Sequence, residues 1–302
     1  MRVVIALGGN AILKRGELLT AENQRQNVRR AAIAIGQVIE AGHEVIITHG
    51  NGPQVGLMAL QDAAYDQALA SPFDVLGAET EGMIGYLIEQ ELGNVMPAKN
   101  EVATLLTQVE VDATDPAFRN PTKQIGPVYG KKEAAALAAR HGWVMVPDGS
   151  HFRRAVASPR PKRILEIGVI QLLIEHGVTV ICTGGGGIPV IRRKDDSYIG
   201  IEAVIDKDHA SGLLAREINA DVLLLLTDIN GVYLGWGTAQ QRRLEFTKPS
   251  ELSSYSFEAG SMGPKVRAAA DFVAGGGKTA GIGRLEDALK ILGRRAGTIV
   301  EA

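Results

Sequence analysis

The sequence predicts an α/β fold with a mainly parallel sheet that is shared by two α/β halves. Residues 3–7, 43–48 and 178–183 are short segments rich in β-branched side chains, and a glycine-containing loop follows each of them. Such runs are typical of strands buried on both faces of a parallel sheet. Because open α/β sheets bind ligands at the carboxyl ends of their strands, the loops predict a site for a large anionic ligand, such as a nucleotide plus a second anion.

Helices and further strands alternate with these segments. Residues 21–40 place apolar side chains at three-to-four spacing and stop before Gly42, which favours a helix crossing between the first two strands. We expect further helices at 55–68, 78–92, 164–176, 208–218, 264–274 and 285–292, and further strands at 102–109, 222–226, 279–282 and 298–300. A hairpin is expected from 189–193 and 202–205.

Residues 112–161 differ in character from the rest of the chain. Six prolines and several basic residues lie there, around a short predicted helix at 131–140 and a short predicted strand at 143–146. Long irregular stretches inside compact domains usually have a functional role. We therefore expect an inserted subdomain or lid on the main sheet.

The composition suits a soluble enzyme or binding protein with a well-buried core, since 45% of the 302 residues are hydrophobic and 22% are charged. A net charge of -2 gives no bulk attraction to nucleic acid or to an anionic membrane, so neither is expected as a partner. The single cysteine, Cys182, excludes an intramolecular disulfide and is predicted to be a small buried side chain. With no signal-peptide pattern and no apolar run of membrane-spanning length, a cytoplasmic protein is expected.

Familiar phosphate and metal motifs are absent from the sequence. The P-loop pattern does not occur, and residues 50–56 have the wrong spacing for a dinucleotide-binding fingerprint, with Pro53 removing an N–H donor. Neither a zinc-protease His-Glu-x-x-His motif nor a Cys-x-x-Cys pair is present, so no protein-bound metal site is predicted. Phosphate chemistry would have to depend on local basic residues.

Three lysines are expected at junctions where a loop meets a helix: Lys123, Lys207 and Lys265. Asp206 suits a helix N-cap and Asp208 a first-turn acid, but Lys207 between them opposes the positive end of the helix dipole. Lys265, after a glycine loop and a helix-starting proline, is in the same position. A bound phosphate would explain cations at these places, although any single exposed lysine is more often only solvated.

Other polar residues have both a structural and a functional interpretation. Thr227 and Asp228 follow the most apolar predicted strand and can form either a simple turn or the wall of a nucleotide pocket, with the next apolar residues covering a purine. His49 has no acid partner identifiable from the sequence, so we favour a structural role over that of a base. Arg153 and Arg154 are interpreted as surface or lid charges, with a clamp on substrate phosphate as the alternative.

Six motifs together resemble the carbamate kinases of the amino acid kinase family, and the resemblance covers essentially the whole chain. In order, they are residues 6–11 (ALGGNA), 49–56 (HGNGPQVG), 120–123 with 125–127 (NPTK and IGP), 184–189 (GGGGIP), 202–208 (EAVIDKD) and 260–265 (GSMGPK). Each motif alone is modest evidence, but six in the order of the family make a strong signal.

The resemblance implies a three-layer αβα sandwich assembled as a homodimer, with residues 1–302 forming one domain of the family's type. Residues 1–163, including a lid at about 112–161, would hold carbamate or carbamoyl phosphate, and residues 164–302 would hold ATP or ADP. The implied reaction is reversible phosphoryl transfer between ATP and carbamate, which gives ADP and carbamoyl phosphate. Mg²⁺ is expected to accompany the nucleotide.

The motifs also imply roles for individual residues. Lys123, Lys207 and Lys265 would surround the transferred phosphoryl group. Substrate and phosphate binding is expected from Gly8, Gly9, Asn10, Gly50, Asn51 and Gly52. Nucleotide binding is expected from Gly185, Gly186, Asp206, Asp208, Thr227, Asp228, Val232, Tyr233, Ser261 and Met262.

The chemistry agrees with this interpretation, because carbamate is already an anionic nucleophile and needs no strong general base. Electrostatic stabilisation by lysines, Mg²⁺ and N–H groups is what such a transfer requires. Two alternatives stay open: a sibling kinase that acts on an acylated amino acid, aspartate or UMP, and a non-catalytic nucleotide or anion sensor on the same fold. The three lysines speak against the sensor, and the residues suit either direction of the reaction.

Overall fold

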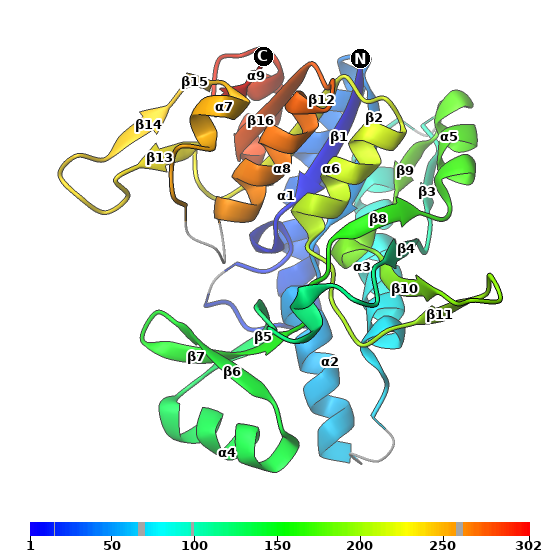
Figure 1. Ribbon diagram of the computed structural model, residues 1–302. Helices are drawn as coiled ribbons and strands as arrows, with labels where there is room; N and C mark the ends of the chain where they lie inside the picture. Colours follow the sequence, from blue (N-terminus) through cyan, green and yellow to red (C-terminus); the bar gives the residue numbers. More distant parts are fainter. Residues whose placement is uncertain (15, 66–69, 98–99, 258–261) are drawn as a thin grey trace.

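The central sheet contains eight strands. They are β1 (Arg2–Leu7), β2 (Glu44–His49), β3 (Val102–Thr104), β9 (Thr179–Ile181), β12 (Val222–Thr227), β15 (Phe246–Thr247), β16 (Thr279–Arg284) and β17 (Thr298–Val300). Their order is β15-β17-β16-β12-β1-β2-β9-β3, and all neighbours are parallel except β16 and β17 (Figure 1). This computed structural model describes residues 1–14, 16–65, 70–97, 100–257 and 262–302. The predicted α/β fold with a mainly parallel sheet is confirmed.

Strand register brings three loops together at one edge of the sheet. In β1, Leu7 lies beside His49 of β2 on one side and beside Leu226 of β12 on the other. All three strands run in the same direction, so the chain leaves them at neighbouring points. The loops that carry the predicted substrate and nucleotide residues therefore begin side by side.

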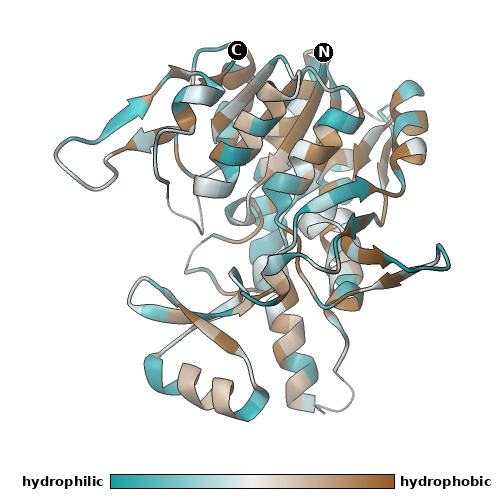
Figure 2. Cartoon of the chain, viewed as in Figure 1, coloured by the Kyte–Doolittle hydropathy of each residue, from teal (hydrophilic) through white to brown (hydrophobic). Residues whose placement is uncertain are grey.

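Helices cover both faces of the sheet, which gives the three layers expected of an αβα sandwich. One face packs against α1 (Ala21–Glu40), α3 (Phe73–Val95) and α9 (Ala288–Leu292), and the other against α5 (Ile167–Glu175), α6 (Lys207–Glu217) and α8 (Met262–Ala274). In Figure 2 the strands between these layers are largely brown, as apolar strands buried on both faces should be. The side chain of Thr20 caps α1 by accepting from Asn23 N, as the sequence of this helix favours.

Smaller elements are attached to this sandwich. A second sheet has the order β11-β10-β4-β8, and β13 pairs with β14. The bounds are β4 (Gln108–Val111), β8 (Pro161–Ile164), β10 (Ile188–Arg192), β11 (Tyr198–Gly200), β13 (Val232–Leu234), β14 (Arg242–Leu244) and α7 (Pro249–Leu252). Short 3₁₀ turns are η1 (Gly9–Ala11), η3 (Pro116–Phe118), η4 (Gly184–Gly186) and η5 (Leu285–Asp287).

Residues 123–156 form a separate small unit, here called the insert module. It consists of β5 (Lys123–Tyr129), α4 (Lys131–His141), β6 (Val144–Asp148) and β7 (His151–Val156), with the antiparallel strand order β5-β7-β6. It lies beside α2 (Gly52–Tyr65), at the lower left in Figure 1. A Cβ on Gly56 of α2 would lie 2.0 Å from Gly126 Cα, so the two backbones touch and only glycine fits.

The insert module covers fewer residues than the predicted insertion, 123–156 instead of 112–161, and more of them are in regular helix and strand than expected. The expected helix at 131–140 and strand at 143–146 are present as α4 and β6, but they belong to a sheet that the proline-rich composition concealed. The flanking parts of the predicted 112–161 insertion lie outside this module, because β8 pairs with β4 in the second sheet.

Three predicted elements differ in the structure. Residues 102–109 form two strands in two sheets, because β3 ends where Leu105 N donates to Ile181 O and β4 then pairs with β10. The hairpin partner of β10 is β11, so residues 202–205 are not a strand. The helix expected from residue 164 begins at Ile167, because Ile164 is the last residue of β8 and pairs there with Val109 of β4.

Other boundaries shift by a few residues. Helix α2 begins at Gly52 instead of residue 55, and the predicted end of that helix at 66–68 lies outside the described residues. Helix α3 is longer at both ends than the predicted 78–92. The predicted helix 285–292 is a 3₁₀ turn, η5, followed by α9. Within the described ranges, no helix is both long and apolar enough to cross a bilayer.

Candidate active site

Two carboxylates at the start of α6 organise the candidate site. Asp206 is the N-cap of this helix, and its Oδ1 accepts from the backbone N–H groups of Asp208 and His209 at 3.0 and 3.3 Å. The capping role predicted for Asp206 is therefore confirmed. Its other oxygen, and both oxygens of Asp208, face lysine side chains.

The three predicted catalytic lysines meet at these two acids, although they come from distant parts of the chain. Lys123 Nζ, from the first residue of the insert module, lies 2.6 Å from Asp206 Oδ2. Lys265 Nζ, from the first turn of α8, lies 3.1 Å from Asp208 Oδ2, and Lys207 Nζ pairs with Asp208 Oδ1. We call Lys123, Lys207 and Lys265 the lysine cluster.

Burial makes these charges strong. Lys207 is 7% exposed and Asp208 3%. Burial alone would raise the pKa of Asp208, but Lys207 and Lys265 outweigh it, so the pKa is lowered and the carboxylate stays ionised. Burial would lower the pKa of Lys265, but Asp208, Asp206 and Asp228 together outweigh it and raise the pKa. The pKa of Lys207 is lowered by burial, against the pull of Asp208.

Two glycine turns lie against the lysine cluster. A Cβ on Gly50 would be 3.4 Å from Gly9 N and 3.8 Å from Lys207 Cδ, so these backbones approach closely beside the buried lysine. A Cβ on Gly8 would lie 2.9 Å from Leu226 O, the atom to which Gly8 N donates at 3.0 Å. A side chain at position 8 would therefore separate the loop after β1 from the end of β12, whereas a Cβ at position 50 would be in ordinary contact.

The loop after β12 is tied to the loop after β1. Asn10 Nδ2 donates to Asp228 Oδ2 at 2.8 Å, and Thr227 Oγ1 donates to Asp228 Oδ1 at 3.0 Å. Asp228 is exposed, and its carboxylate is one of the charges that raise the pKa of Lys265. The predicted nucleotide residues Thr227 and Asp228 thus lie next to the predicted substrate residue Asn10.

An aromatic pocket of about 370 Å³ opens beyond this loop. It is lined by Ile229, Gly231, Tyr233, Leu234, Gly235, Trp236, Tyr255, Ser256, Phe257 and Met262. The predicted residues Tyr233 and Met262 are part of this wall. Val232 lies behind it, fully buried, with its N–H donated to Thr298 Oγ1 at 2.8 Å. The predicted Ser261 lies outside the described residues.

Sequence reasoning missed most of the aromatic wall. Tyr233 and Trp236 contact edge to face with ring centroids 5.2 Å apart, and Tyr255 and Phe257 contact in the same way at 6.3 Å. Trp236 is 62% exposed. Two aromatic pairs after the most apolar strand were the available signal, since exposed large aromatics in a concave surface usually bind something.

The predicted nucleotide residues Gly185 and Gly186 lie with the substrate loops. A Cβ on Gly185 would be 2.2 Å from Asn51 Nδ2, and a Cβ on Gly186 would be 2.5 Å from Ile205 O. Asn51 is buried and donates to Thr80 Oγ1 at 2.9 Å. These two glycines therefore contact the loop after β2 and the residue that precedes the Asp206 cap.

The structure gives the positions of His49, Cys182 and Arg154, each of which has more than one interpretation from the sequence. His49 is fully buried, and burial lowers its pKa to about 4, so the ring is neutral near pH 7. Cys182 is buried as predicted, and burial raises the pKa of its thiol. Arg154 lies over the rings of Phe73 and Trp143 at 4.7 and 4.0 Å, which ties the insert module to α3.

Among the described residues there is no group of three or more His, Cys, Asp or Glu side chains that could hold a metal ion. Asp206 and Asp208 are engaged by lysines. The exposed Asp228 accepts from the neutral donors Asn10 and Thr227, and a carboxylate of this kind fits Mg²⁺, which commonly uses one or two protein carboxylates together with phosphate oxygens.

The arrangement can bind a polyanion whose one end is flat and aromatic. Clustered ammonium groups and close glycine backbones attract phosphate, and the neighbouring pocket suits a base. The sequence pattern of the amino acid kinase family matches residues 1–283. The chain belongs to the amino acid kinase family.

Relatives within that family are close over the full length. The chain is 56% identical to a carbamate kinase of Rhizobium meliloti, covering 100% of this chain and 94% of that one, and 54% identical to one of Haemophilus influenzae, covering 99% and 96%. A solved carbamate kinase of Giardia lamblia bound to citric acid superposes with a TM-score of 0.94 at 43% identity, covering 99% and 98%. The predicted resemblance to carbamate kinase is confirmed.

Proposed function

We propose that the protein is a phosphotransferase that moves a phosphoryl group reversibly between MgATP and carbamate, giving MgADP and carbamoyl phosphate. The observation that carries this proposal is the meeting of Lys123, Lys207 and Lys265 at Asp206 and Asp208. A sibling kinase would share the nucleotide side, but the chain is at least 47% identical over 99% or more of its length to eight carbamate kinases, which favours carbamate as the acceptor.

In the proposed reaction a carbamate oxygen attacks the γ-phosphorus of ATP, a new P–O bond forms, and the P–O bond to ADP breaks. No proton needs to be removed from the nucleophile, which suits a site where the nearby His49 is buried and neutral. The lysine cluster would neutralise the charge that spreads over the phosphoryl oxygens. One such contact is typically worth about 10²-fold or more in rate.

Each group in the site would have a distinct task. Gly8 to Asn10 and Gly50 to Gly52 would bind the anions through backbone and amide donors. Asp206 and Asp208 would hold the three ammonium groups in place, so that little reorganisation is needed when charge moves. Lys123, which belongs to the insert module, would bring a cation to the substrate only when this module lies close.

The aromatic pocket would hold the nucleotide base. Tyr233 and Met262 line it next to the loop of Asp228, so a base there would direct its phosphates toward the lysine cluster. A solved Giardia lamblia carbamate kinase bound to AMP-PNP, 43% identical with a TM-score of 0.88, supports a nucleotide on this fold.

Mg²⁺ would be carried by the phosphates of the nucleotide. When bound, it would neutralise phosphate charge. Asp228 would hold it, directly or through water, because this exposed carboxylate lies beside the anion-binding loops and accepts only neutral donors in the contacts above. The lysine cluster would then neutralise the charge on the transferred phosphoryl group.

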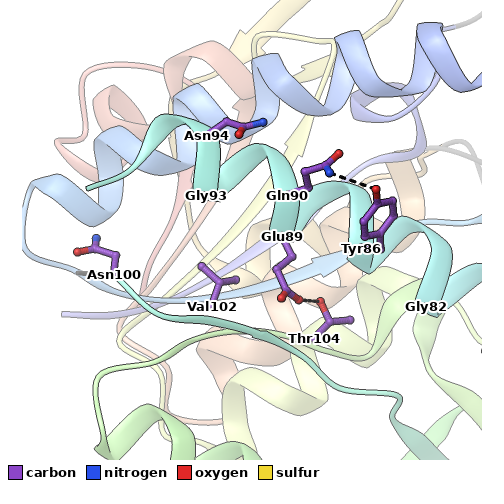
Figure 3. A pocket seen from close by; sticks show the side chains of 9 residues that line it. All are labelled: Gly82, Tyr86, Glu89, Gln90, Gly93, Asn94, Asn100, Val102 and Thr104. Atoms are coloured by element: carbon purple, nitrogen blue, oxygen red, sulfur yellow. Dashed lines mark hydrogen bonds between the residues drawn. The ribbon is translucent and has the colours of Figure 1, made fainter. Parts of the chain in front are cut away.

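We also propose a homodimer, with the edge of the sheet at β3 as the contact surface. A pocket of about 520 Å³ lies there between α3 and β3 and includes Tyr86, Gln90 and Thr104 (Figure 3). Tyr86 and Leu106 are 54% and 52% exposed, and among the described residues β9 is the only strand beside β3 in the sheet order. An open strand edge beside exposed apolar side chains suits a second copy of the same surface. A monomeric mass at micromolar concentration would exclude the dimer.

The expected cytoplasmic location and the division into a substrate half and a nucleotide half stay predictions. The buried thiol of Cys182 and the absence of paired cysteines in the sequence are compatible with a reducing compartment.

The test is ATP formation from carbamoyl phosphate and MgADP, measured with hexokinase and with acetyl phosphate as the control donor. We expect rapid Mg²⁺-dependent ATP formation with carbamoyl phosphate and little with acetyl phosphate. A panel of aspartate, N-acetylglutamate and UMP with ATP identifies a sibling kinase. Nucleotide binding without turnover on any of these would contradict the proposal and favour a sensor.

A further inference from the structure

A buried carboxyl group, Glu81 of α3, lies directly behind a loop of the candidate site. Glu81 is 1% exposed. Its Oε1 accepts from Gly184 N at 2.7 Å, and its Oε2 accepts from Thr107 N at 3.2 Å. A Cβ on Gly184 would lie 2.8 Å from Glu81 Cγ and 2.4 Å from His49 Nε2, so these two side chains enclose the glycine. Both carboxyl oxygens thus hold backbone.

The loop in question, residues 183–187, adopts a conformation that needs such support. Thr183 has φ 48°, which an L side chain rarely adopts, and Gly185, Gly186 and Gly187 all have positive φ. Thr183 N donates to Thr107 Oγ1 at 3.0 Å. Glu81 therefore holds this loop directly at Gly184 and indirectly through Thr107, whose side chain accepts from Thr183 N.

This loop contacts the proposed transfer site on two sides. Gly185 lies against the Asn51 amide, which donates to Thr80, the neighbour of Glu81 on α3. Gly186 lies against the carbonyl of Ile205, which directly precedes Asp206. A displacement of the loop would therefore move Asn51 and the Asp206 cap, although Glu81 itself touches neither the lysine cluster nor the aromatic pocket in the contacts given above.

We propose that Glu81 is a positioning residue for phosphoryl transfer, which fixes the loop 183–187 and through it Asn51 and Asp206. The proposal rests on the proposed function for its kinetic consequence and on the hydrogen bonds alone for its structural one. It reassigns Gly185 and Gly186 from nucleotide binding to the support of Asn51 and of the residue before Asp206. It therefore predicts a defect on the side of carbamate or carbamoyl phosphate and little effect on the nucleotide base, which would bind in the aromatic pocket.

The hydrogen-bond donors to Glu81 described above are neutral backbone N–H groups, not lysine or arginine side chains. The titratable groups that face it are His49 at the end of β2, Cys182 after β9 and Glu166 at the start of α5. Burial raises the pKa of Glu81 to about 8, against the opposing N–H groups of Thr107 and Gly184. When the carboxyl group is protonated near pH 7, each oxygen still has a lone pair. Both oxygens can therefore still accept from the N–H groups of Gly184 and Thr107.

The substitution Glu81→Gln tests the positioning role, because the amide has the same shape as the carboxyl group but only one acceptor oxygen. Its NH₂ group would face one of the two backbone N–H groups, of Gly184 or Thr107, and that hydrogen bond would be lost. Glu91→Gln is the matched control: Glu91 is also buried on α3, ten positions along, and pairs with Arg25 instead of the loop. For Glu81→Gln we expect kcat to fall, or KM for carbamoyl phosphate to rise, by about tenfold or more. KM for ADP should change less than twofold, and Glu91→Gln should behave as wild type.

Amide hydrogen exchange in a peptide that covers residues 183–187 gives a readout that does not need activity. We expect exchange there to be about tenfold faster in Glu81→Gln and unchanged in Glu91→Gln. If wild type makes no ATP from carbamoyl phosphate but exchange responds in this way, the proposed function fails and the positioning role of Glu81 stands at the loop.

Two results would overturn the proposal. One is folded Glu81→Gln protein with wild-type kinetics and wild-type amide exchange. The other is a loss of activity in Glu91→Gln as large as that in Glu81→Gln. If Glu81→Gln does not fold, Thr107→Val replaces it. This change removes the hydroxyl that accepts from Thr183 N and donates to Leu105 O, and it keeps the backbone N–H that donates to Glu81 Oε2. Wild-type kinetics and exchange in Thr107→Val would then contradict the role of the loop anchor.

Discussion

Lys123 and Asp206 join the insert module to the body of the protein: Lys123 Nζ lies 2.6 Å from Asp206 Oδ2. Lys123 begins β5, whereas Asp206 caps α6 beside the central sheet. The ion pair is part-buried, with 27% and 13% of the two side chains exposed. Its position means that the insert module contributes one cation to the site and that Asp206 orients it.

Removing this cation should impair transfer without unfolding the protein. For Lys123→Ala we expect turnover to fall about 10²-fold, because one electrostatic contact to the transferred group is lost. The melting temperature should change little, since Lys123 is partly exposed. Lys162→Ala is the control, as Lys162 pairs with Asp112 at 3.2 Å and more than half of its side chain is exposed. Equal activity in the two variants would exclude a role for Lys123.

Lys265 should matter for the reaction more than for nucleotide binding. In Lys265→Met the aliphatic stem is kept, Asp208 retains Lys207, and the charge near Asp228 is lost. We expect turnover to fall about 10²-fold, while calorimetric affinity for ADP falls much less. Lys278→Met, at an exposed lysine paired with Asp221, serves as the comparison. A loss confined to ADP affinity would reassign Lys265 to nucleotide binding.

The buried Glu81 should make stability depend on pH. Its pKa rises from 4.5 to about 8 on folding, so the folded state binds a proton that the unfolded state has released. Its contribution is complete below pH 4.5 and is lost as pH rises through 8. Between pH 6.5 and 8 the free energy of unfolding should therefore fall by on the order of 1–2 kcal/mol.

Denaturant unfolding of wild type and Glu81→Gln at pH 6.5 and 8 measures this term. The neutral amide should remove most of the difference. His49 does not interfere, because burial lowers its pKa to about 4 and its opposite contribution changes only between pH 4 and 6.5. Identical pH dependence in the two proteins would show that Glu81 is not protonated on folding.

The aromatic pocket should control nucleotide affinity. For Tyr233→Ala we expect KM for ADP to rise about tenfold, through the lost ring contact, with kcat nearly unchanged. Tyr233→Phe separates the ring from the hydroxyl, which donates to Asn230 Oδ1 at 2.6 Å, and should keep most of the affinity. Unchanged ADP affinity in Tyr233→Ala would place the base elsewhere.

Local pattern predicted the sandwich well. Strands such as β1 and β12 are apolar throughout, and α1 has both its cap and its buried stripe in the sequence. Lys207 and Lys265 could be singled out because a cation at the start of a helix is electrostatically unfavourable without an anion. For Lys123 the expectation of a helix start is wrong, because this residue begins strand β5. The pairing of Lys123 with Asp206, 83 positions apart, depends on the docking of the insert module and has no local signal.

Other parts of the site depended on tertiary context. Residues 102–109 read as one strand, but the chain leaves the central sheet after Thr104 and pairs with β10. Glu81 lies in a helix whose pattern gives no reason to single out one acid, and its importance comes from Gly184 and Thr107, which are distant in sequence. Ordinary charge patterning does not reveal a buried carboxyl group that accepts backbone N–H groups.

The most direct test of the account is the turnover of Lys207→Ala in the hexokinase-coupled assay, with folding checked by its melting temperature and by ADP binding. Lys207 is the most buried member of the lysine cluster and lies against both Asp208 and Gly50. We predict folded protein that binds ADP and forms ATP from carbamoyl phosphate at least about 10²-fold more slowly than wild type. Near-normal turnover in that folded protein would contradict the assignment of the lysine cluster to phosphoryl transfer.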